Sequence, residues 1–195
     1  MHDFTDAEPD RTDLEAPVSW EIDYPSWVAD EILPGLFMGG THDDTTVADP
    51  MQLVGLGGPR EYDAVVTLYA WAQPVAWEIE ELRYGFGDGA LDGADLQRVL
   101  RAARWAHERW QAGDRVLIRC QAGLNRSGLV TALVLVLAGW DPAEAILHLR
   151  AQRSPHVLFN DHFVRWLVRE APAAIGAGPQ PQERSDQGPA SGRVA

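Results

Sequence analysis

The stretch that decides the fold is VLIRCQAGLNRSG, which occupies residues 116–128. Its opening run, Val116–Ile118, is apolar and β-branched at two positions, which is typical of a short buried strand. A loop with a central glycine follows, and an apolar segment then runs from about Arg126 to Ala138, where Gly139 ends it. This segment predicts a buried helix. The order of strand, short loop and helix indicates one unit of an α/β fold.

Similar segments alternate on both sides of this unit. The expected strands are residues 36–38, 64–69, 82–86 and 115–119. The further expected helices cover about 93–112 and begin at Asp141-Pro142 and, as the last helix, at Asn160. Strands that alternate with helices predict an α/β fold in which helices flank a central mixed, largely parallel sheet.

The composition excludes several classes of protein. The chain has 195 residues, one cysteine, no lysine and a net charge of −13. A single cysteine excludes an internal disulfide framework and any multi-thiolate metal site, and it fits a reducing compartment. The negative charge argues against binding nucleic acid or anionic membranes through bulk charge. We therefore expect a cytoplasmic protein, and the scattered histidines suggest no metal site or other cofactor.

The charge and the composition divide the chain into three parts. Residues 1–17 are acidic and polar, which predicts a disordered N-terminal segment. Residues 172–195 are rich in Gly, Pro, Gln and Ser, which predicts a disordered tail. One folded domain is expected between them, at 18–171, and the aromatic residues Trp20, Tyr24 and Trp27 are expected to pack on it.

The loop after the strand at 115–119 combines the parts of an anion-binding, nucleophilic site. Backbone N–H groups of residues 121–126 can curl around an anion, and the helix N-terminus adds its dipole. The same positive field favours the thiolate form of Cys120. Arg126 can hold two oxygens of a phosphate with its planar fork, and Gly123 permits close backbone approach. A lone cysteine is more often a small buried hydrophobe, but packing alone does not require this joint pattern.

Residues 120–127 match the motif C-x-x-G-x-x-R-[S/T] and so resemble the cysteine-dependent dual-specificity and tyrosine phosphatases. Leu33–Gly39 resembles the opening strand of the dual-specificity type. Further matches to the pattern downstream of the loop are Arg150, Arg153, Asn160 and Phe163. The resemblance covers about residues 31–170 and implies a protein tyrosine phosphatase-like fold, with 18–171 as the catalytic domain.

The resemblance implies a role for each residue of the motif. Cys120 would be the nucleophile that forms a phosphocysteine, Arg126 would balance the phosphate charge, and Ser127 would hydrogen-bond the sulfur. The phosphate-binding residues would be Gln121, Ala122, Gly123, Leu124, Asn125 and Arg126. The family usually has histidine before the cysteine, whereas this chain has Arg119, which either supplies positive charge to the loop or points away from it.

The general acid is expected to be Asp88, which stands 32 residues before the cysteine in a glycine-rich segment. By the resemblance, it would protonate the leaving oxygen and then activate the hydrolytic water. Asp92 and Asp95 are close in sequence, but each has an alternative explanation, because they stand at the expected start of the helix at 93–112, where aspartate serves as a cap.

The neutral loop side chains bear on the substrate. Phosphoinositide phosphatases of this superfamily tend to carry extra basic residues there, so the sequence favours phosphotyrosine, phosphoserine or phosphothreonine in a protein or peptide. The alternatives are a phosphoinositide or other small phosphomonoester, and a catalytically weak phosphate-binding adaptor. A rhodanese-like sulfur transferase also places a cysteine in an anion loop, but the Arg126-Ser127 pair and the upstream aspartate argue against it.

Overall fold

The computed structural model of the chain describes residues 29–41 and 61–176. The predicted N-terminal segment at 1–17, the three aromatic residues after it and the last nineteen residues of the predicted tail lie outside the described residues. The fold and the site are therefore built from the two described ranges.

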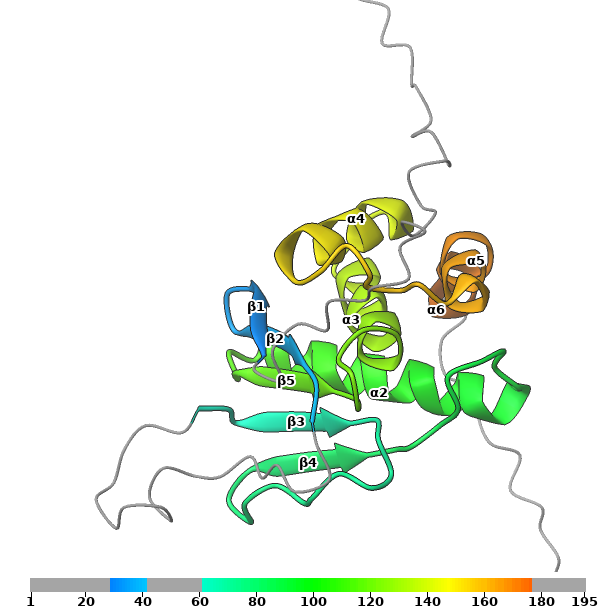
Figure 1. Ribbon diagram of the computed structural model, residues 1–195. Helices are drawn as coiled ribbons and strands as arrows, with labels where there is room; N and C mark the ends of the chain where they lie inside the picture. Colours follow the sequence, from blue (N-terminus) through cyan, green and yellow to red (C-terminus); the bar gives the residue numbers. More distant parts are fainter. Residues whose placement is uncertain (1–28, 42–60, 177–195) are drawn as a thin grey trace, which may run out of the picture.

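Five short strands form one sheet in the order β1-β2-β5-β3-β4. Their bounds are β1 Asp30–Leu33, β2 Leu36–Gly39, β3 Ala64–Thr67, β4 Glu80–Arg83 and β5 Val116–Arg119. Only the β1–β2 hairpin pairs antiparallel; the other three pairs are parallel. Figure 1 shows the strands from β1 at the top to β4 at the bottom, with α4 above them and α5 and α6 on the right. The expected mixed, largely parallel sheet is confirmed.

Five helices lie within the described ranges. They are α2 Gly93–Gln111, α3 Arg126–Leu137, α4 Pro142–Gln152, α5 Asp161–Arg169 and α6 Ala171–Gly176. Side-chain oxygens of Asp92, Asp141 and Asn160 cap the N-termini of α2, α4 and α5 by accepting backbone N–H groups. The capping pattern in the sequence therefore placed these helix starts to within a residue.

The structure differs from the sequence prediction at three elements. The strand expected at 82–86 is β4, at Glu80–Arg83. The prediction started too late because strands are recognised by apolar residues, whereas this edge strand is mostly polar and partly exposed. Strand β1 was not predicted, since it has only two apolar residues. Helix α6 follows α5 and occupies the start of the predicted tail; three of its six residues are alanine, the residue with the highest helix propensity.

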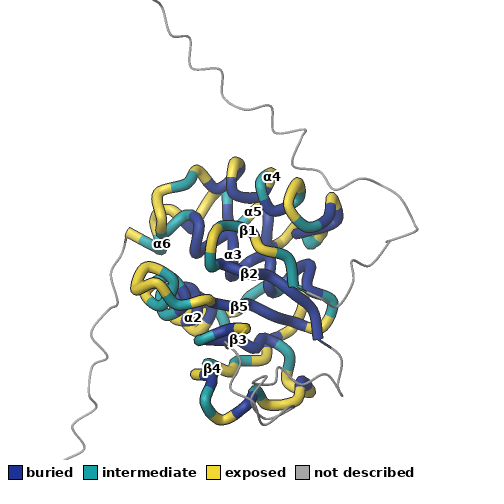
Figure 2. Tube along the Cα trace, turned by 90° about the vertical axis from the view of Figure 1, so that its left-hand side faces the viewer, coloured by how far each residue is buried: buried dark blue, intermediate teal, exposed yellow. Residues whose placement is uncertain are grey.

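Strand β5 lies at the centre of the sheet and divides its side chains between two faces. Ile118 and Cys120 face the main core, which also includes buried residues of α2 to α5. Leu117 faces a smaller cluster with Phe37 and Val65 on the opposite side. Figure 2 shows β2 and β5 as buried along their length. The loop that follows β5 therefore starts from a fully buried, fixed position.

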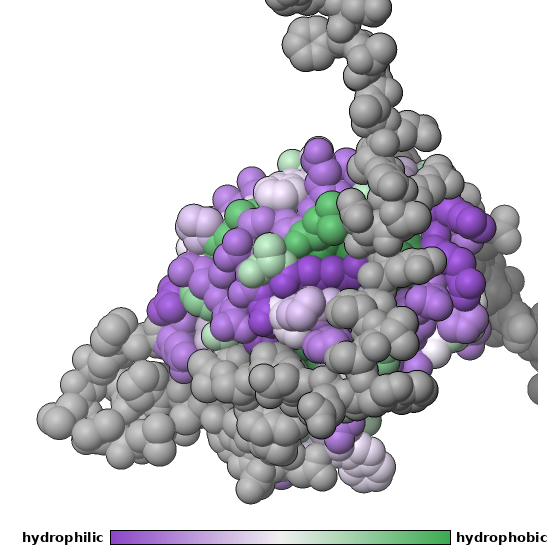
Figure 3. Space-filling view, turned by 45° about the horizontal axis from the view of Figure 1, so that its top comes forward, coloured by the Kyte–Doolittle hydropathy of each residue, from purple (hydrophilic) through white to green (hydrophobic). Residues whose placement is uncertain are grey.

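One face of the molecule is mostly polar. On the face drawn in Figure 3, hydrophilic residues surround a few small apolar areas. Among the described residues, no helix combines the length and the apolar character needed to cross a bilayer.

Two neighbours on α4 allow the core to be tested. Ile146 is fully buried, whereas Leu147, the next residue, is 39% exposed. We expect Ile146→Ala to lower the free energy of unfolding by about 2–5 kcal/mol, because it removes packed methyl groups and leaves a cavity. Leu147→Ala is the matched control and should change it by less than about 1 kcal/mol. Urea denaturation measures both, and similar values for the two variants would contradict this assignment of the core.

Candidate active site

Cys120 stands directly after β5 and is buried, with 2% of its surface exposed. The backbone N–H of Gly123 donates to its Sγ at 3.2 Å. The hydroxyl of Ser127, in the first turn of α3, lies 3.3 Å from the same sulfur. The thiol is thus held at the floor of the loop by two groups that can donate hydrogen bonds to a thiolate.

The carbonyl oxygens of the loop point outward, to three partners from other parts of the chain. The Thr41 N–H donates to the Gln121 carbonyl at 2.9 Å, and the Leu158 N–H donates to the Leu124 carbonyl at 3.3 Å. The guanidinium Nε of Arg153 donates to the carbonyl of Gly123 at 2.6 Å. These bonds fix the orientation of three of the loop's peptide groups.

This orientation determines where the N–H groups point. In a planar trans peptide, the carbonyl of one residue and the N–H of the next point in opposite directions. The outward carbonyls of 121, 123 and 124 therefore direct the N–H groups of Ala122, Leu124 and Asn125 inward. The first N–H groups of α3, which follow directly in the chain, have no partner within the helix, and together these donors suit an anion.

Gly123 is required by two features of the backbone. Its φ is +69°, in the left-handed region that disfavours residues with a side chain. A Cβ on it would also lie 2.5 Å from the backbone of both Gly39 and Gly40. The loop and the end of β2 therefore fit together only with glycine at this position.

Arg153 places a buried positive charge beside the loop. Its side chain is fully buried, and Nη1 forms an ion pair with the carboxylate of Asp30 at 2.6 Å. Burial lowers the pKa of Arg153, while Asp30 and, more weakly, Cys120 act to raise it. Arg153 thus binds the carbonyl of Gly123, the residue whose N–H donates to the Cys120 sulfur.

Arg150 supports the same loop indirectly, through the segment at Val157 and Leu158. Its Nε donates to the carbonyl of Val157 at 3.0 Å, and Nη2 donates to the carbonyl of Leu158 at 3.2 Å. Leu158 is in the left-handed region, with φ of 58°, and its N–H is the donor to Leu124. The two downstream arginines of the sequence motif therefore both brace the loop.

Arg126, the first residue of α3, extends toward the ends of β3 and β4. Its Nη1 donates to the carbonyls of Leu68 at 3.3 Å and Phe86 at 3.4 Å. The guanidinium lies over the ring of Tyr69, 5.6 Å from its centroid. Its Nε is buried and has no hydrogen-bond partner among the described residues. An anion held by the loop would provide the acceptor that this N–H needs.

Asp88 is tied to the loop through two amides. Nδ2 of Asn125 donates to its Oδ2 at 3.0 Å, and Nδ2 of Asn160 donates to its Oδ1 at 3.0 Å. Asp92 instead caps α2 by accepting the N–H of Asp95, and Asp95 accepts a hydrogen bond from the Tyr84 hydroxyl. The alternative explanation of Asp92 as a cap is confirmed, and of the three aspartates only Asp88 contacts the loop.

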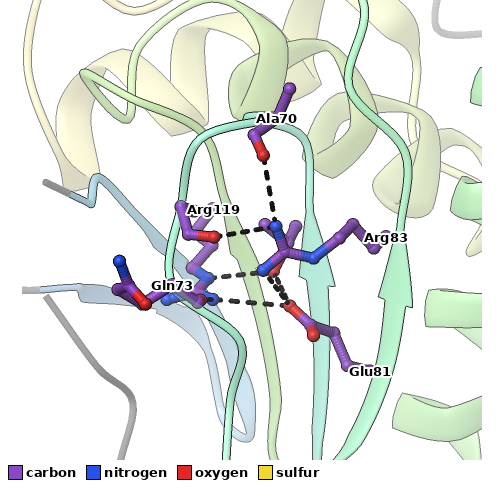
Figure 4. A network of polar contacts seen from close by, with 7 residues as sticks. Ala70, Gln73, Glu81, Arg83 and Arg119 are labelled. Atoms are coloured by element: carbon purple, nitrogen blue, oxygen red, sulfur yellow. Dashed lines mark hydrogen bonds and ion pairs between the residues drawn. The ribbon is translucent and has the colours of Figure 1, made fainter. Parts of the chain in front are cut away.

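Arg119 does not face the loop. Its Nε donates to the Thr67 hydroxyl at 2.9 Å, and Nη2 donates to the Gln73 carbonyl at 2.7 Å and lies 3.4 Å from the Glu81 carboxylate. Figure 4 shows this network beside Arg83, which binds the carbonyl of Ala70. Burial lowers the pKa of Arg119, and Glu81 opposes that shift. Of the two expectations for Arg119, the one in which it points away is correct.

Several supporting residues have no local signal in the sequence. Thr41 and Asp30 stand far from the loop in the chain and belong to no motif, so only the fold shows that they contact it. Arg150 and Arg153 were found through the resemblance, although their contacts were not foreseen. Within the described ranges, no group of three or more His, Cys, Asp or Glu side chains is arranged to hold a metal ion.

Comparison with known proteins agrees with this geometry. Residues 94–171 match the family model for the catalytic domain of dual specificity phosphatases. No curated protein sequence matches the chain significantly. The solved structure of Tk-PTP in its active form is 24% identical, and the match covers 74% of this chain and 96% of that one, with a TM-score of 0.58.

Two further solved structures share the fold. PTPMT1 in complex with PI(5)P is 18% identical, with 78% of this chain and 98% of that one covered and a TM-score of 0.60. Human DUSP28 is 18% identical, with 76% and 95% covered and a TM-score of 0.58. Matches at such low identity show only that the fold is shared, whereas the family model matches the sequence pattern of the catalytic domain. The predicted resemblance to the dual-specificity phosphatases is therefore confirmed.

The fit around Gly123 gives a test of the loop. Gly113, at the end of α2, also has positive φ, at +98°, but nothing lies within 4 Å of a Cβ built there. Gly113→Ala should lower the free energy of unfolding by about 1–2 kcal/mol, because alanine disfavours the left-handed backbone conformation. Gly123→Ala should cost about 1–3 kcal/mol more, because its methyl group meets fixed backbone. Chemical denaturation measures the difference, and equal costs would mean that the loop has room to move.

Proposed function

We propose that this chain hydrolyses phosphotyrosine, phosphoserine or phosphothreonine monoesters in proteins through a phosphocysteine intermediate. The observation that supports this most directly is the position of the Cys120 sulfur, beneath a cradle of inward N–H groups, with Arg126 and Asp88 at the same loop. The family match and the shared fold support a cysteine-based phosphatase. We also propose residues 18–171 as its catalytic domain.

In the first step, the thiolate of Cys120 attacks phosphorus. A sulfur–phosphorus bond forms as the bond from phosphorus to the ester oxygen breaks. The protonated carboxyl group of Asp88 transfers its proton to that oxygen, so the substrate leaves as a neutral alcohol or phenol. Arg126 and the inward N–H groups balance the charge on the three other phosphate oxygens, which is the main contribution a protein can make to phosphoryl transfer.

In the second step, water attacks the phosphocysteine. The Asp88 carboxylate, left without its proton, accepts one from the water as the new oxygen–phosphorus bond forms. The sulfur–phosphorus bond breaks, and Cys120 leaves as a thiolate. The Ser127 hydroxyl, 3.3 Å from the sulfur, is placed to donate a hydrogen bond to the departing thiolate. Inorganic phosphate is the product, and the enzyme returns to its starting form.

The substrate preference rests on the neutral character of the loop. Gln121, Ala122, Leu124 and Asn125 carry no charge, and Arg119, which directly precedes the nucleophile in the sequence, faces the other side of the sheet. The loop therefore offers positive charge for a single phosphate group. A phosphoinositide phosphatase is the second candidate, because PTPMT1, which shares the fold, was solved with PI(5)P.

The chemistry is tested by the hydrolysis of p-nitrophenyl phosphate with no metal added. We expect the wild-type chain to turn over and vanadate to inhibit it. Cys120→Ser should lose all measurable turnover, because the hydroxyl is a far weaker nucleophile than the thiolate. If the wild-type chain showed no turnover but bound phosphopeptides, the adaptor alternative would be correct; continued turnover by the variant would exclude the phosphocysteine.

The role of Asp88 is tested against its neighbour Asp92. Asp88→Asn should lower kcat by roughly 100-fold or more for aryl phosphates with poor leaving groups, since general acid catalysis contributes about 10²–10⁴-fold. The loss should shrink as the leaving phenol becomes more acidic. Asp92→Asn keeps the cap of α2 and should leave kcat nearly unchanged. Equal losses in the two variants would count against Asp88 as the acid.

A substrate panel distinguishes the two candidate functions. We expect kcat/KM to be higher for phosphotyrosine, phosphoserine or phosphothreonine peptides than for soluble phosphoinositides, because the loop holds no basic side chain for a second phosphate. The Cys120→Ser variant serves as the blank for contaminating phosphatases. A preference for phosphoinositides of tenfold or more would favour the second candidate.

A further inference from the structure

The chain contains only two asparagines, and both donate to the same carboxylate. Asn125 comes from the loop after β5, and Asn160 is the N-cap of α5. Their Nδ2 atoms each lie 3.0 Å from a different oxygen of Asp88. Three segments that are distant in the sequence therefore meet at one aspartate.

The two amides are themselves held in a fixed direction. Oδ1 of Asn125 accepts the backbone N–H of Asn160 at 3.1 Å, and Oδ1 of Asn160 accepts the N–H of His162 at 3.0 Å. With each oxygen engaged on one side, each NH₂ group is turned to the other side, toward Asp88. Asn125 is also almost fully buried, with 3% of its surface exposed. The donors are thus positioned before Asp88 meets them.

Asp88 has little other support. It is exposed, and it lies between Gly87 and Gly89, where a built Cβ would meet nothing within 4 Å. Glycines without close neighbours leave the backbone a wide choice of conformations, and ordering it costs about 1–2 kcal/mol per residue. A catalytic group on such a segment needs side-chain contacts to keep it within reach of the reacting atoms.

We propose that Asn125 and Asn160 are positioning residues that hold the Asp88 carboxyl group over the Cys120 loop. This inference rests on the proposed function, in which Asp88 is the general acid and base. Each carboxylate oxygen has two lone pairs, and each amide occupies one. A lone pair therefore remains on each oxygen to carry the proton that Asp88 transfers, so the amides orient the acid without displacing its proton.

The contacts can be tested without turnover. Selective ¹⁵N labelling of asparagine side chains should give two NH₂ groups in the NMR spectrum, one for each residue. We expect Asp88→Ser to shift both groups, because each loses its acceptor. Asp92→Ser is the matched control, since it keeps the cap of α2 and should shift neither. If neither NH₂ signal shifted in Asp88→Ser, the inference would be overturned.

The catalytic consequence is tested with Asn160→Ser, which retains an oxygen to cap α5 but removes the amide donor. We expect kcat to fall on the order of tenfold for aryl phosphates with poor leaving groups, part of the effect of losing the acid. For good leaving groups it should be nearly unchanged. Gln111→Ser, at an exposed amide at the end of α2, is the matched control and should have no effect.

A double substitution separates positioning from damage to the loop. In an Asp88→Asn background, Asn160→Ser should change kcat by less than about twofold, because the acid it positions is already absent. A loss that is equal for all leaving groups, or that persists in this background, would overturn the inference. If the wild-type chain does not turn over at all, the proposed function fails, and the NMR comparison alone decides whether the two asparagines hold Asp88.

Discussion

The outward direction of the loop carbonyls is the constraint on which the site depends. Isolated, a six-residue loop after a strand has no reason to point its N–H groups to one place. Here the carbonyls of Gln121, Gly123 and Leu124 are bound from outside by Thr41 just after β2, by the guanidinium of Arg153 just after α4, and by Leu158 before α5. Because each peptide group is planar and trans, a carbonyl held outward turns the next N–H inward, toward the anion cradle. The anion site is thus built by the groups that surround the loop.

The positive charges near the nucleophile are divided by the sheet. Arg153 and Arg126 lie on the side of the loop, whereas Arg119, although next to Cys120 in sequence, is bound to Glu81 and to the Gln73 carbonyl on the other face. Alternation along a strand makes this unavoidable, since consecutive side chains point to opposite faces. Arg119 therefore binds the connection between β3 and β4, and the contacts to the loop come from other arginines.

The sequence predicted the features of the fold that depend on local sequence patterns. The main strands, the caps Asp92, Asp141 and Asn160, and the strand–loop–helix around Cys120 follow from periodicity and turn chemistry. The two edge strands were not predicted correctly: β1 was missed, and β4 was placed two residues late. Their sequences are largely polar, so they become strands through pairing with their neighbours and not through an apolar pattern of their own. In the candidate site, the motif residues were found, but Thr41 and Asp30 were not. Which distant residue completes a loop is a property of the tertiary structure.

The ion pair between Asp30 and Arg153 joins positions 123 residues apart, and the bond between Asn160 and Asp88 spans 72. Loop-closure entropy makes such distant contacts late events in folding. The cradle therefore comes into existence only when both ends of the domain are in place, and partly folded chains lack it. An anion that binds the cradle stabilises the complete fold by mass action. Conversely, loosening β1 or the end of α4 would weaken the proposed anion binding while most of the secondary structure persists.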